Sequence, residues 1–592
     1  MITQYKKATP STFKLSREHL IFFGIALVAS LLLSIPFFIG PNRGPFAAHA
    51  FHHSSFVSQI IGDIFPPENP GLGGTKIGYY WGFHALIAVL TSLTNTHQLQ
   101  VVFIFNTLSL LAVFNIAYSF AKALDLPEQY CYILPLAIVG LMRPEAGLFI
   151  VYKFLSGKLI PVDAIVTHNI ALLPSDVLSS WIGELPWLDT RLFYVNKLYN
   201  VSAMPLAISL CFSYLLILFR NKFRSNKIYL VSLCFVIIAC ILNYPPLAIF
   251  SILHAPIWAV VVFLSRQGHF KEKFHDTSRV LLPYIIAVLS VTPYLIFVIA
   301  GRDISSSSQG EIVSLDFYAQ SVRNIVVFLI PFLGIVIGIW FAYRKSSLRD
   351  FYFLLIGTAL CLGLTTLTRW SFDNSYKFNY ILVFFFSIFF VISIYRLLYQ
   401  NTNRWITRFI YSGVILLLLI TPLTIEIAYI VSCLSQDRFF SFSKGHIIYS
   451  KDEAKNDAYA WIRENTPTNS LIMMSYFETR VPYEGLNPNY EVAAISERSL
   501  YVIKDTDYTT SNPEYAKRVK LREKLFKNPD DPQVIDFFRS LNRPVYLLVE
   551  ENLRDVFLVE DRFKHFPENP GEPFELKFRN NKQRVYHIHF NK

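Results

Sequence analysis

The sequence predicts a polytopic α-helical membrane protein that ends in a smaller α/β domain. Of its 592 residues, 53% are hydrophobic and 16% are charged, whereas soluble domains are about a quarter charged. Apolar segments of about 20 residues, the length that crosses a bilayer as a helix, recur from residue 19 to residue 432. Lys and Arg outnumber Asp and Glu by 54 to 42. Many of these cations lie in short connectors, where they set membrane topology, so we expect no nucleic-acid partner.

The apolar segments predict about 11–13 transmembrane helices. The candidates are residues 19–40, 79–94, 101–122, 130–152, 201–219, 228–243, 246–265, 280–300, 322–343, 351–368, 380–399 and 409–432. Arg143, Pro144 and Glu145 interrupt the fourth segment. We expect a re-entrant or split helix there, because irregular backbone at membrane depth is tolerated only where protein or water covers it.

Basic connectors predict the topology. They precede the first span and occupy every second connector after Arg220, which places them and the N-terminus in the cytoplasm. Loops 41–78 and 156–200 are then extracytoplasmic, and so is the chain beyond the last span. We predict a membrane domain over 1–434 and a soluble extracytoplasmic domain over 435–592, in the plasma (inner) membrane of a bacterial cell.

The C-terminal region alternates between helix and strand patterns. Helices are predicted up to WIRENTP (461–467), over 514–526 and over 533–541, and strands at SLIMMSY (470–476) and PVYLLVEE (544–551). A hairpin is expected around Asn580 and Asn581. This alternation predicts a small α/β domain of ordinary size.

Several chemistries find no support in the sequence. The six cysteines lie in or beside apolar segments or at the end of the last one, without a zinc-type spacing. No phosphate-binding Gly-rich loop, HExxH or GxSxG motif or dinucleotide fingerprint is present. We therefore predict no definite cofactor, although a divalent metal is compatible with the histidines of the first loop.

The first extracytoplasmic loop carries the richest chemistry. His49, His52 and His53 could supply a base or bind metal, and His49 would share a helix face with each of the others. Asp63 and Glu68 could act as a general base towards an acceptor hydroxyl. The alternative is that the histidines are interfacial and that Asp63 caps a turn. For a single residue this alternative is favoured, and for the loop as a whole a functional site is favoured.

The end of this loop, PPENPGLGGTKIGYYWGFH, has the prolines and glycines of a fixed, non-helical path. Tyr79, Tyr80 and Trp81 could form a stacking wall for a sugar, since aromatic side chains are common in small-molecule sites, and His84 could bind substrate beside them. The alternative is the aromatic belt of a membrane interface.

Cations on the predicted outer side form a second group. Arg191 and Lys197 lie in the second loop, and Arg369 and Lys377 lie at the mouth of two spans. Outside loops should be poor in such residues, so these cations suggest a phosphate-bearing ligand. The alternatives are snorkelling for Lys197 and a structural pair of Lys377 with Asp373.

Together these stretches resemble a known family. Phe51-His52, PP-x-NP (66–70), YYW-x-FH (79–84), NKLYNVSAMPL (196–206), SYKFNY (375–380), WIRENTP and ISERSLYV (495–502) are similar to segments of bacterial GT-C superfamily membrane glycosyltransferases. The resemblance implies transfer of a sugar from polyprenyl phosphate to an extracytoplasmic glycan, lipid or protein acceptor, with membrane lipids as further partners. It also implies that Lys197, Arg369 and Lys377 bind the carrier phosphate.

The family places an Asp or Glu in the first outside loop as base or metal ligand. Here Ala48, His49 and Ala50 fill the slot before Phe51-His52. The role then falls to His49 or His52, or to Asp63 or Glu68, unless the chain has diverged or lost activity.

Two other functions stay open at this point. A transporter or flippase of lipid-linked glycans would use the same cations and aromatic residues, and charges within the helices would favour it. Such charges are sparse, with Glu145 and Glu426 the clearest, whereas the outside loops are dense in polar residues, which favours an enzyme. A receptor-like scaffold is the third alternative and has no specific support.

Overall fold

The computed structural model describes the chain in segments, and the account below concerns these alone. They are residues 16–35, 43–44, 50–142, 202–220, 227–265, 269–300, 313–315, 332–345, 348–370, 375–399, 404–435, 440–443, 446–449, 453–479, 490–503, 509, 512–550, 557–559 and 566–590. The predicted loop 156–200 lies outside them.

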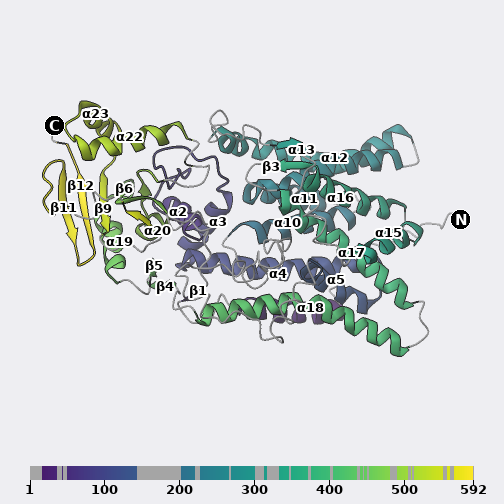
Figure 1. Ribbon diagram of the computed structural model, residues 1–592. Helices are drawn as coiled ribbons and strands as arrows, with labels where there is room; N and C mark the ends of the chain where they lie inside the picture. The colour runs from purple at the N-terminus through teal and green to yellow at the C-terminus, as the bar shows by residue number, and fades with distance from the viewer. Residues whose placement is uncertain are drawn as a thin grey trace.

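The larger part of the protein is a bundle of apolar helices (Figure 1). They are α1 (Arg17–Leu32), α3 (Gly82–Thr94), α4 (Gln98–Ala123), α5 (Glu128–Gly140), α10 (Met204–Arg220), α11 (Lys227–Asn243), α12 (Pro245–Ser265), α13 (Phe270–Ala300), α15 (Phe332–Lys345), α16 (Leu348–Thr366), α17 (Asn379–Tyr399) and α18 (Arg404–Ser435). Each predicted apolar segment overlaps one of them. Among the described helices, α4, α12, α13, α17 and α18 are long and apolar enough to cross a membrane.

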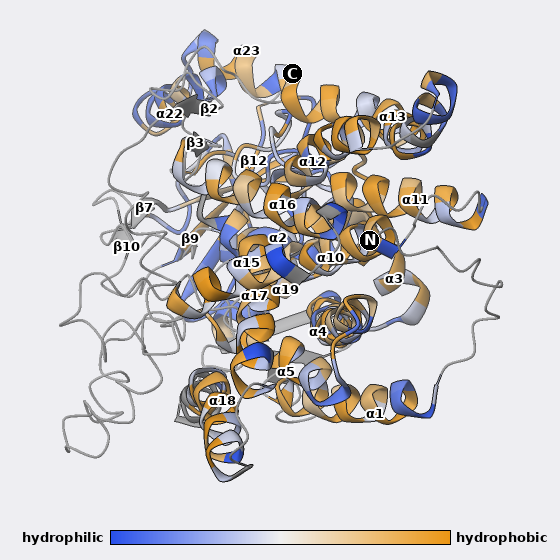
Figure 2. Ribbon diagram, turned by 90° about the vertical axis from the view of Figure 1, so that its right-hand side faces the viewer, coloured by the Kyte–Doolittle hydropathy of each residue, from blue (hydrophilic) through white to orange (hydrophobic). Residues whose placement is uncertain are grey.

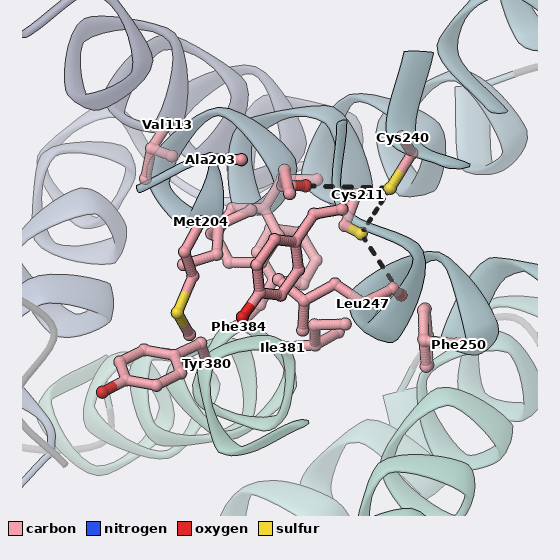
Figure 3. Close-up of a cluster of buried hydrophobic side chains, with 14 of the residues drawn as sticks. Val113, Ala203, Met204, Cys211, Cys240, Leu247, Phe250, Tyr380, Ile381 and Phe384 are labelled. Atoms are coloured by element: carbon pink, nitrogen blue, oxygen red, sulfur yellow. Dashed lines mark hydrogen bonds between the residues drawn. The ribbon is translucent and has the colours of Figure 1, made fainter. Parts of the chain in front are cut away.

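The bundle has an apolar interior and an apolar exterior. Figure 3 shows the interior, where Phe384 of α17 packs among side chains of α10, α11 and α12. Cys211 and Cys240 lie there as free thiols, with their sulfur atoms 3.4 Å apart. On the outside, Leu282, Leu289 and Ile296 of α13 are exposed at a spacing of seven residues. A soluble protein rarely exposes such a stripe, and helix surfaces in Figure 2 are widely hydrophobic. The chain is a polytopic membrane protein.

At Gly140, the backbone of α5 lies in close contact with the backbone of α18. A Cβ atom on Gly140 would lie 1.8 Å from the Leu418 carbonyl oxygen, so α5 and α18 approach as only a glycine allows. α5 ends there, shortly before the predicted interruption. Arg143, Pro144 and Glu145 themselves lie outside the described residues.

Beyond α18 the chain forms a C-terminal α/β domain. Its main sheet has the order β11-β12-β9-β6-β8, in which β6 is parallel to β9 and β8, and β12 is antiparallel to β9 and β11. The strands are β6 (Leu471–Met474), β8 (Ser499–Leu500), β9 (Val545–Glu550), β11 (Phe574–Arg579) and β12 (Gln583–Ile588), and the helices are α19 (Glu453–Asn465), α20 (Glu491–Ser496), α22 (Pro513–Lys527) and α23 (Pro532–Ser540). These elements confirm the predicted alternation.

Local sequence explains several boundaries in this domain. The side chains of Asn512 and Asp531 cap α22 and α23, and a proline occupies the first position of each helix. The predicted hairpin is confirmed, because the Asn580 side chain accepts hydrogen bonds from the amides of Lys582 and Gln583. Such side-chain-to-backbone bonds are typical of Asn in turns.

The chain after the first helix meets the chain after the last one. β1 (Arg43–Gly44) pairs with β4 (Phe440–Ser443), which pairs in turn with β5 (His446–Tyr449). Smaller pairings join β2 (Val313–Leu315) to β3 (Thr368–Trp370) and β7 (Tyr476–Thr479) to β10 (Phe557–Val559). The first loop and the C-terminal domain therefore lie on the same side of the bundle, as the topology argument expects.

Candidate active site

The first loop is largely a buried structure, not a solvated one. It contains α2 (Ala50–Ile61), and every residue from 51 to 59 is buried. α2 packs on α3 and α4 of the bundle and on α20 of the C-terminal domain, and it lies between the two parts in Figure 1. The histidines of α2 are therefore buried among other side chains of the protein.

His53 forms a pair with His84, the second histidine of the YYW-x-FH stretch. Nδ1 of His53 and Nε2 of His84 lie 2.7 Å apart, and the rings stack with centroids 5.0 Å apart. One nitrogen must donate a proton to the other, so the pair shares a proton. His53 comes from α2 and His84 from the first turn of α3, so the α2–α3 packing sets this geometry.

His52 points to the C-terminal domain. Its ring lies 4.7 Å from that of Tyr490, the residue that precedes α20, and 4.9 Å from that of Phe56. The adjacent histidines therefore have different further partners, as expected from the 100° step of a helix, although both rings also lie near Tyr79. His52 closes the site towards the C-terminal domain, and His53 faces the bundle.

A row of aromatic rings leads from the histidines to Lys377. Tyr79 lies 5.5 Å from the His52 ring and stacks on Tyr80 at 4.1 Å, and its hydroxyl donates a hydrogen bond of 3.1 Å to the Tyr80 hydroxyl. The Tyr80 ring meets Tyr244 edge-on at 4.9 Å. Lys377 Nζ lies 5.0 Å from the centre of the Tyr244 ring, a cation–π distance. Segments far apart in the sequence thus contribute to one continuous row of buried rings.

The Lys377 end of this row contains a second polar group. Lys377 belongs to the 3-10 helix η4 (Ser375–Phe378), and α17 starts directly afterwards at Asn379. Asn379 is fully buried, and neither polar atom of its side chain has a hydrogen-bond partner among the described residues. An unpaired buried amide costs about 1–3 kcal/mol. A ligand that Lys377 and Asn379 hold together would remove this cost.

Trp81 has different ring partners from Tyr80. Its ring contacts Phe65 at 4.9 Å and Tyr294 of α13 at 5.1 Å. Tyr294 also accepts a hydrogen bond from the Gly82 amide and donates one to the Leu242 carbonyl. Trp81 thus helps to fix the start of α3, and the Tyr79–Tyr80 pair is the aromatic surface next to the histidines.

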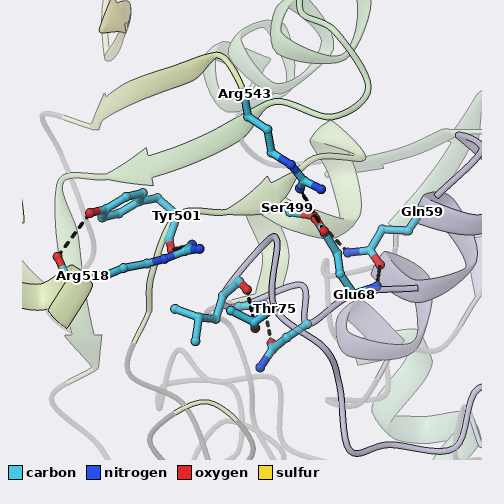
Figure 4. A network of polar contacts seen from close by, with 10 residues as sticks. Gln59, Glu68, Thr75, Ser499, Tyr501, Arg518 and Arg543 are labelled. Atoms are coloured by element: carbon cyan, nitrogen blue, oxygen red, sulfur yellow. Dashed lines mark hydrogen bonds and ion pairs between the residues drawn. The ribbon is translucent and has the colours of Figure 1, made fainter. Parts of the chain in front are cut away.

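Glu68 is held by the C-terminal domain (Figure 4). Its carboxylate oxygens accept hydrogen bonds of 2.7 and 2.9 Å from Arg543, and one of them also accepts a 2.8 Å bond from Ser499. Gln59 of α2 accepts from the Glu68 amide and donates to Ser499. A carboxylate with these partners is fixed in place. We therefore assign Glu68 to the docking of the first loop.

The glycines after Glu68 extend this contact. The Gly73 amide donates to the Leu500 carbonyl of β8, and the Leu500 amide donates to the Pro70 carbonyl, both at 2.8 Å. A Cβ atom on Gly73 would lie 2.5 Å from Leu471 and 2.6 Å from Ser499, so only glycine fits there. The loop thus continues the edge of the main sheet at β8.

Two arginines of the C-terminal domain lie against the docked loop. Gly74 has a φ of +85°, which glycine tolerates, and it lies against Arg518 and Arg543. Arg518 donates a 2.8 Å hydrogen bond to the Tyr501 carbonyl, as Figure 4 shows. Burial lowers the pKa of the Arg518 guanidinium and raises the pKa of the Tyr501 hydroxyl.

Asp63 has a different position again. It is exposed, has a φ of +64° and follows the end of α2. Asp is among the few residues that tolerate this left-handed conformation, so Asp63 serves as a helix terminator. Of the two predicted acids, Asp63 is exposed and Glu68 is ion-paired. The ionisable side chain that lies next to Tyr79 is instead a histidine, His52.

Several predicted site residues cannot be placed. His49, Arg191 and Lys197 lie outside the described residues. The backbone of Arg369 is part of β3, paired with Ser314 of β2. The residues that the sequence reasoning missed are Tyr244, Asn379 and Tyr490, since nothing in their local sequence marks them.

The comparisons with known proteins concern the fold. No protein-family model matches the chain, and the search of curated proteins gives no match either. Among solved structures, the chain is similar to ArnT from Cupriavidus metallidurans bound to undecaprenyl phosphate, at 12% identity over 96% of this chain and 97% of that chain, with a TM-score of 0.50.

Two further structures give lower scores. One is apo ArnT, with a TM-score of 0.49, and the other is an Archaeoglobus fulgidus oligosaccharyltransferase tethered with an acceptor peptide. The latter shares 12% identity over 90% of this chain and 69% of that chain, with a TM-score of 0.48. The likeness to undecaprenyl-phosphate-bound ArnT shows that the two chains share a fold.

Proposed function

We propose that the protein is an integral membrane glycosyltransferase that moves a sugar from a polyprenyl-phosphate donor to an acceptor outside the cytoplasm. The observation that carries this proposal is the continuous row of ring contacts from the His53–His84 pair through the tyrosines to Lys377, in which the His53 ring lies 6.2 Å from that of Tyr79. It offers a base at one end, a sugar-stacking surface in the middle and a cation at the other end. The GT-C fold, and the undecaprenyl phosphate bound to a protein of that fold, support this proposal.

The proposed reaction is a direct displacement at the anomeric carbon. The acceptor hydroxyl gives its proton to the histidine pair while its oxygen forms a bond to the anomeric carbon. The bond from that carbon to the phosphate oxygen breaks, and polyprenyl phosphate leaves with the electron pair. Lys377 stabilises the charge of the leaving phosphate, and the Asn379 amide can donate a hydrogen bond to it.

The histidine pair is preferred as base over the predicted acids. His53 has a nitrogen partner in His84 that can take up or pass on a proton. Glu68 is engaged by Arg543, and Asp63 is exposed at the end of α2. His52 is placed to shape the acceptor side, because it contacts Tyr490 of the C-terminal domain.

The proposed orientation places this site at the outer face of the plasma membrane. The β1–β4 pairing and the Glu68–Arg543 ion pair put the first loop and the C-terminal domain on one side. The basic N-terminus then lies on the cytoplasmic side. The domain division at residue 434 and the outward position of residues 435–592 belong to the same proposal.

A metal is not required by this mechanism. Among the described residues, the one group of three or more His, Cys, Asp or Glu side chains close enough to share an ion lies in the C-terminal domain, on β11 and the β12 end.

The alternative function is transport of a lipid-linked glycan, and one observation favours it. Glu426 of α18 is buried, and neither carboxylate oxygen has a partner among the described residues. Charged groups inside a membrane often mark a transport path.

Reconstitution separates the two functions. The protein in liposomes receives synthetic polyprenyl-phosphate sugars and acceptors, and sugar-dependent release of polyprenyl phosphate is measured. The proposal expects release by the wild type and a loss of about 10²- to 10⁴-fold in His53→Gln. His275→Gln, at an exposed position on α13, is the matched control. Transbilayer movement of the intact donor without any release would establish the transporter and refute the enzyme.

A further inference from the structure

A group of metal-ligating side chains lies on the C-terminal sheet, away from the histidine pair. Glu575 belongs to β11, His587 belongs to β12, and His589 follows β12 directly. One ligand atom from each lies within 4.8 Å of the other two. Neither the sugar-transfer reaction nor the docking of the first loop uses any of them.

The strand geometry brings these three residues together. His587 and His589 are two residues apart, so an extended chain directs both to the same face. Glu575 stands directly opposite His587 in the antiparallel register of β11 and β12. Cross-strand partners have Cβ atoms about 4.5–5.5 Å apart, so the carboxylate reaches the imidazoles.

The two histidine rings lie next to each other. The rings of Tyr546, His587 and His589 form a stack, with centroid distances of 4.8 and 5.3 Å. Nδ1 of His589 is shielded from solvent and makes no hydrogen bond in the described structure. Glu575 Oε2 lies 3.9 Å from this nitrogen.

A neighbouring lysine orients the carboxylate. Lys577 donates a 2.6 Å hydrogen bond to Glu575 Oε1, which leaves Oε2 on the side of His589.

We propose that Glu575, His587 and His589 form a binding site for Zn²⁺ or a similar late first-row divalent cation. Imidazole with carboxylate is a ligand set that suits these metals. In a tetrahedral site with bonds of about 2.0–2.1 Å, ligand atoms are about 3.4 Å apart. The distances between the three ligand atoms, now up to 4.8 Å, must therefore shorten by up to about 1.4 Å. Partly exposed side chains can achieve this by rotation.

The ion would hold the edge of the sheet. β11 is an edge strand of the main sheet. Of the three proposed ligands, Glu575 is the one that belongs to β11. Metal binding would join β11 to β12 and to the segment that follows β12. This site would serve the stability of the domain and is independent of sugar transfer.

The test uses the full-length protein in detergent, purified without a histidine tag. Isothermal titration with ZnCl₂ compares the wild type with the double variant His587→Gln/His589→Gln. We expect one site per chain that the double variant binds at least 10-fold more weakly, and a Zn²⁺-dependent rise in melting temperature that it lacks. A control variant, His269→Gln/His275→Gln, alters exposed histidines elsewhere and should keep both properties.

Two further measurements make the result independent of folding defects. Glu575 is exposed, so the Glu575→Gln variant should fold normally. Its Zn²⁺ affinity should nevertheless be at least 10-fold lower than that of the wild type. With Cu²⁺ as probe, electron paramagnetic resonance should show coupling to two imidazole nitrogens in the wild type and not in the double variant. Equal Zn²⁺ affinity in the wild type and both site variants, or a Cu²⁺ spectrum that the double variant leaves unchanged, would overturn the proposal.

Discussion

Removing Arg543 should release the first loop from the C-terminal domain. Arg543 donates two charge-assisted hydrogen bonds to Glu68, of 2.7 and 2.9 Å. The side chains of Arg543 and Glu68 are 24% and 10% exposed, so water can screen the pair only in part. Bonds of this type contribute about 1.5–3 kcal/mol each when buried. Allowing for the exposure and for the bond that Ser499 retains, we expect Arg543→Ala to cost about 2 kcal/mol.

Hydrogen exchange measures this cost at the contact itself. The amides of Gly73 and Leu500 are protected by the hydrogen bonds between the loop and β8. If they exchange through local opening, a loss of about 2 kcal/mol speeds their exchange about 30-fold. The assay is hydrogen–deuterium exchange of the full-length protein in detergent, read by mass spectrometry over peptides that cover these two residues.

An exposed ion pair in the same domain provides the control. Arg579 and Glu568 form a bond of equal length, 2.7 Å, but their side chains are 54% and 53% exposed. Such pairs contribute about 0–1 kcal/mol, so Arg579→Ala should leave the exchange of Gly73 and Leu500 within about 3-fold of the wild type. If Arg543→Ala accelerates that exchange no more than Arg579→Ala does, then the ion pair does not dock the loop.

Three further variants test other contacts. Gly82→Ala would place a Cβ atom 2.2 Å from the Leu242 carbonyl oxygen and should lower the melting temperature by several degrees, whereas unchanged melting would refute the close approach of α3 and α11. Asn379→Leu removes an unpaired buried amide, so it should raise the melting temperature yet weaken donor binding; a lower melting temperature with normal donor affinity would contradict the role of Asn379. Tyr244→Leu removes the ring that supports Lys377 and should raise the donor KM about 3- to 30-fold with little change in melting, and an unaltered KM would count against this contact.

The helical framework follows from the sequence because its signals are local. A run of about 20 apolar residues has one stable form in a bilayer, and all predicted runs overlap helices. The hairpin at Asn580 and the starts of α22 and α23 are likewise set by turn and capping residues within a few positions. The burial of α2 was missed, since its polar residues are typical of a solvated loop.

The candidate site could be predicted only in part, for a physical reason. His53, Tyr80, His84 and Lys377 stand out because polar or aromatic residues at membrane edges are unusual. The contact between Tyr80 and Lys377 runs through the Tyr244 ring. Tyr244 lies between α11 and α12, and only the folded structure brings it to these two residues. The partner of Glu68 lies 475 residues away in the sequence, and no local pattern marks it.

The central claim is that the histidine pair and Lys377 act at opposite ends of one transfer reaction. The most direct measurement is the donor dependence of polyprenyl phosphate release by His53→Gln and by Lys377→Gln in liposomes. The account predicts that His53→Gln lowers kcat by about 10²- to 10⁴-fold with a nearly unchanged donor KM. Lys377→Gln should instead raise the donor KM at least about 10-fold, because it loses a charge that binds phosphate. Release by both variants at the wild-type kcat and KM would contradict the account.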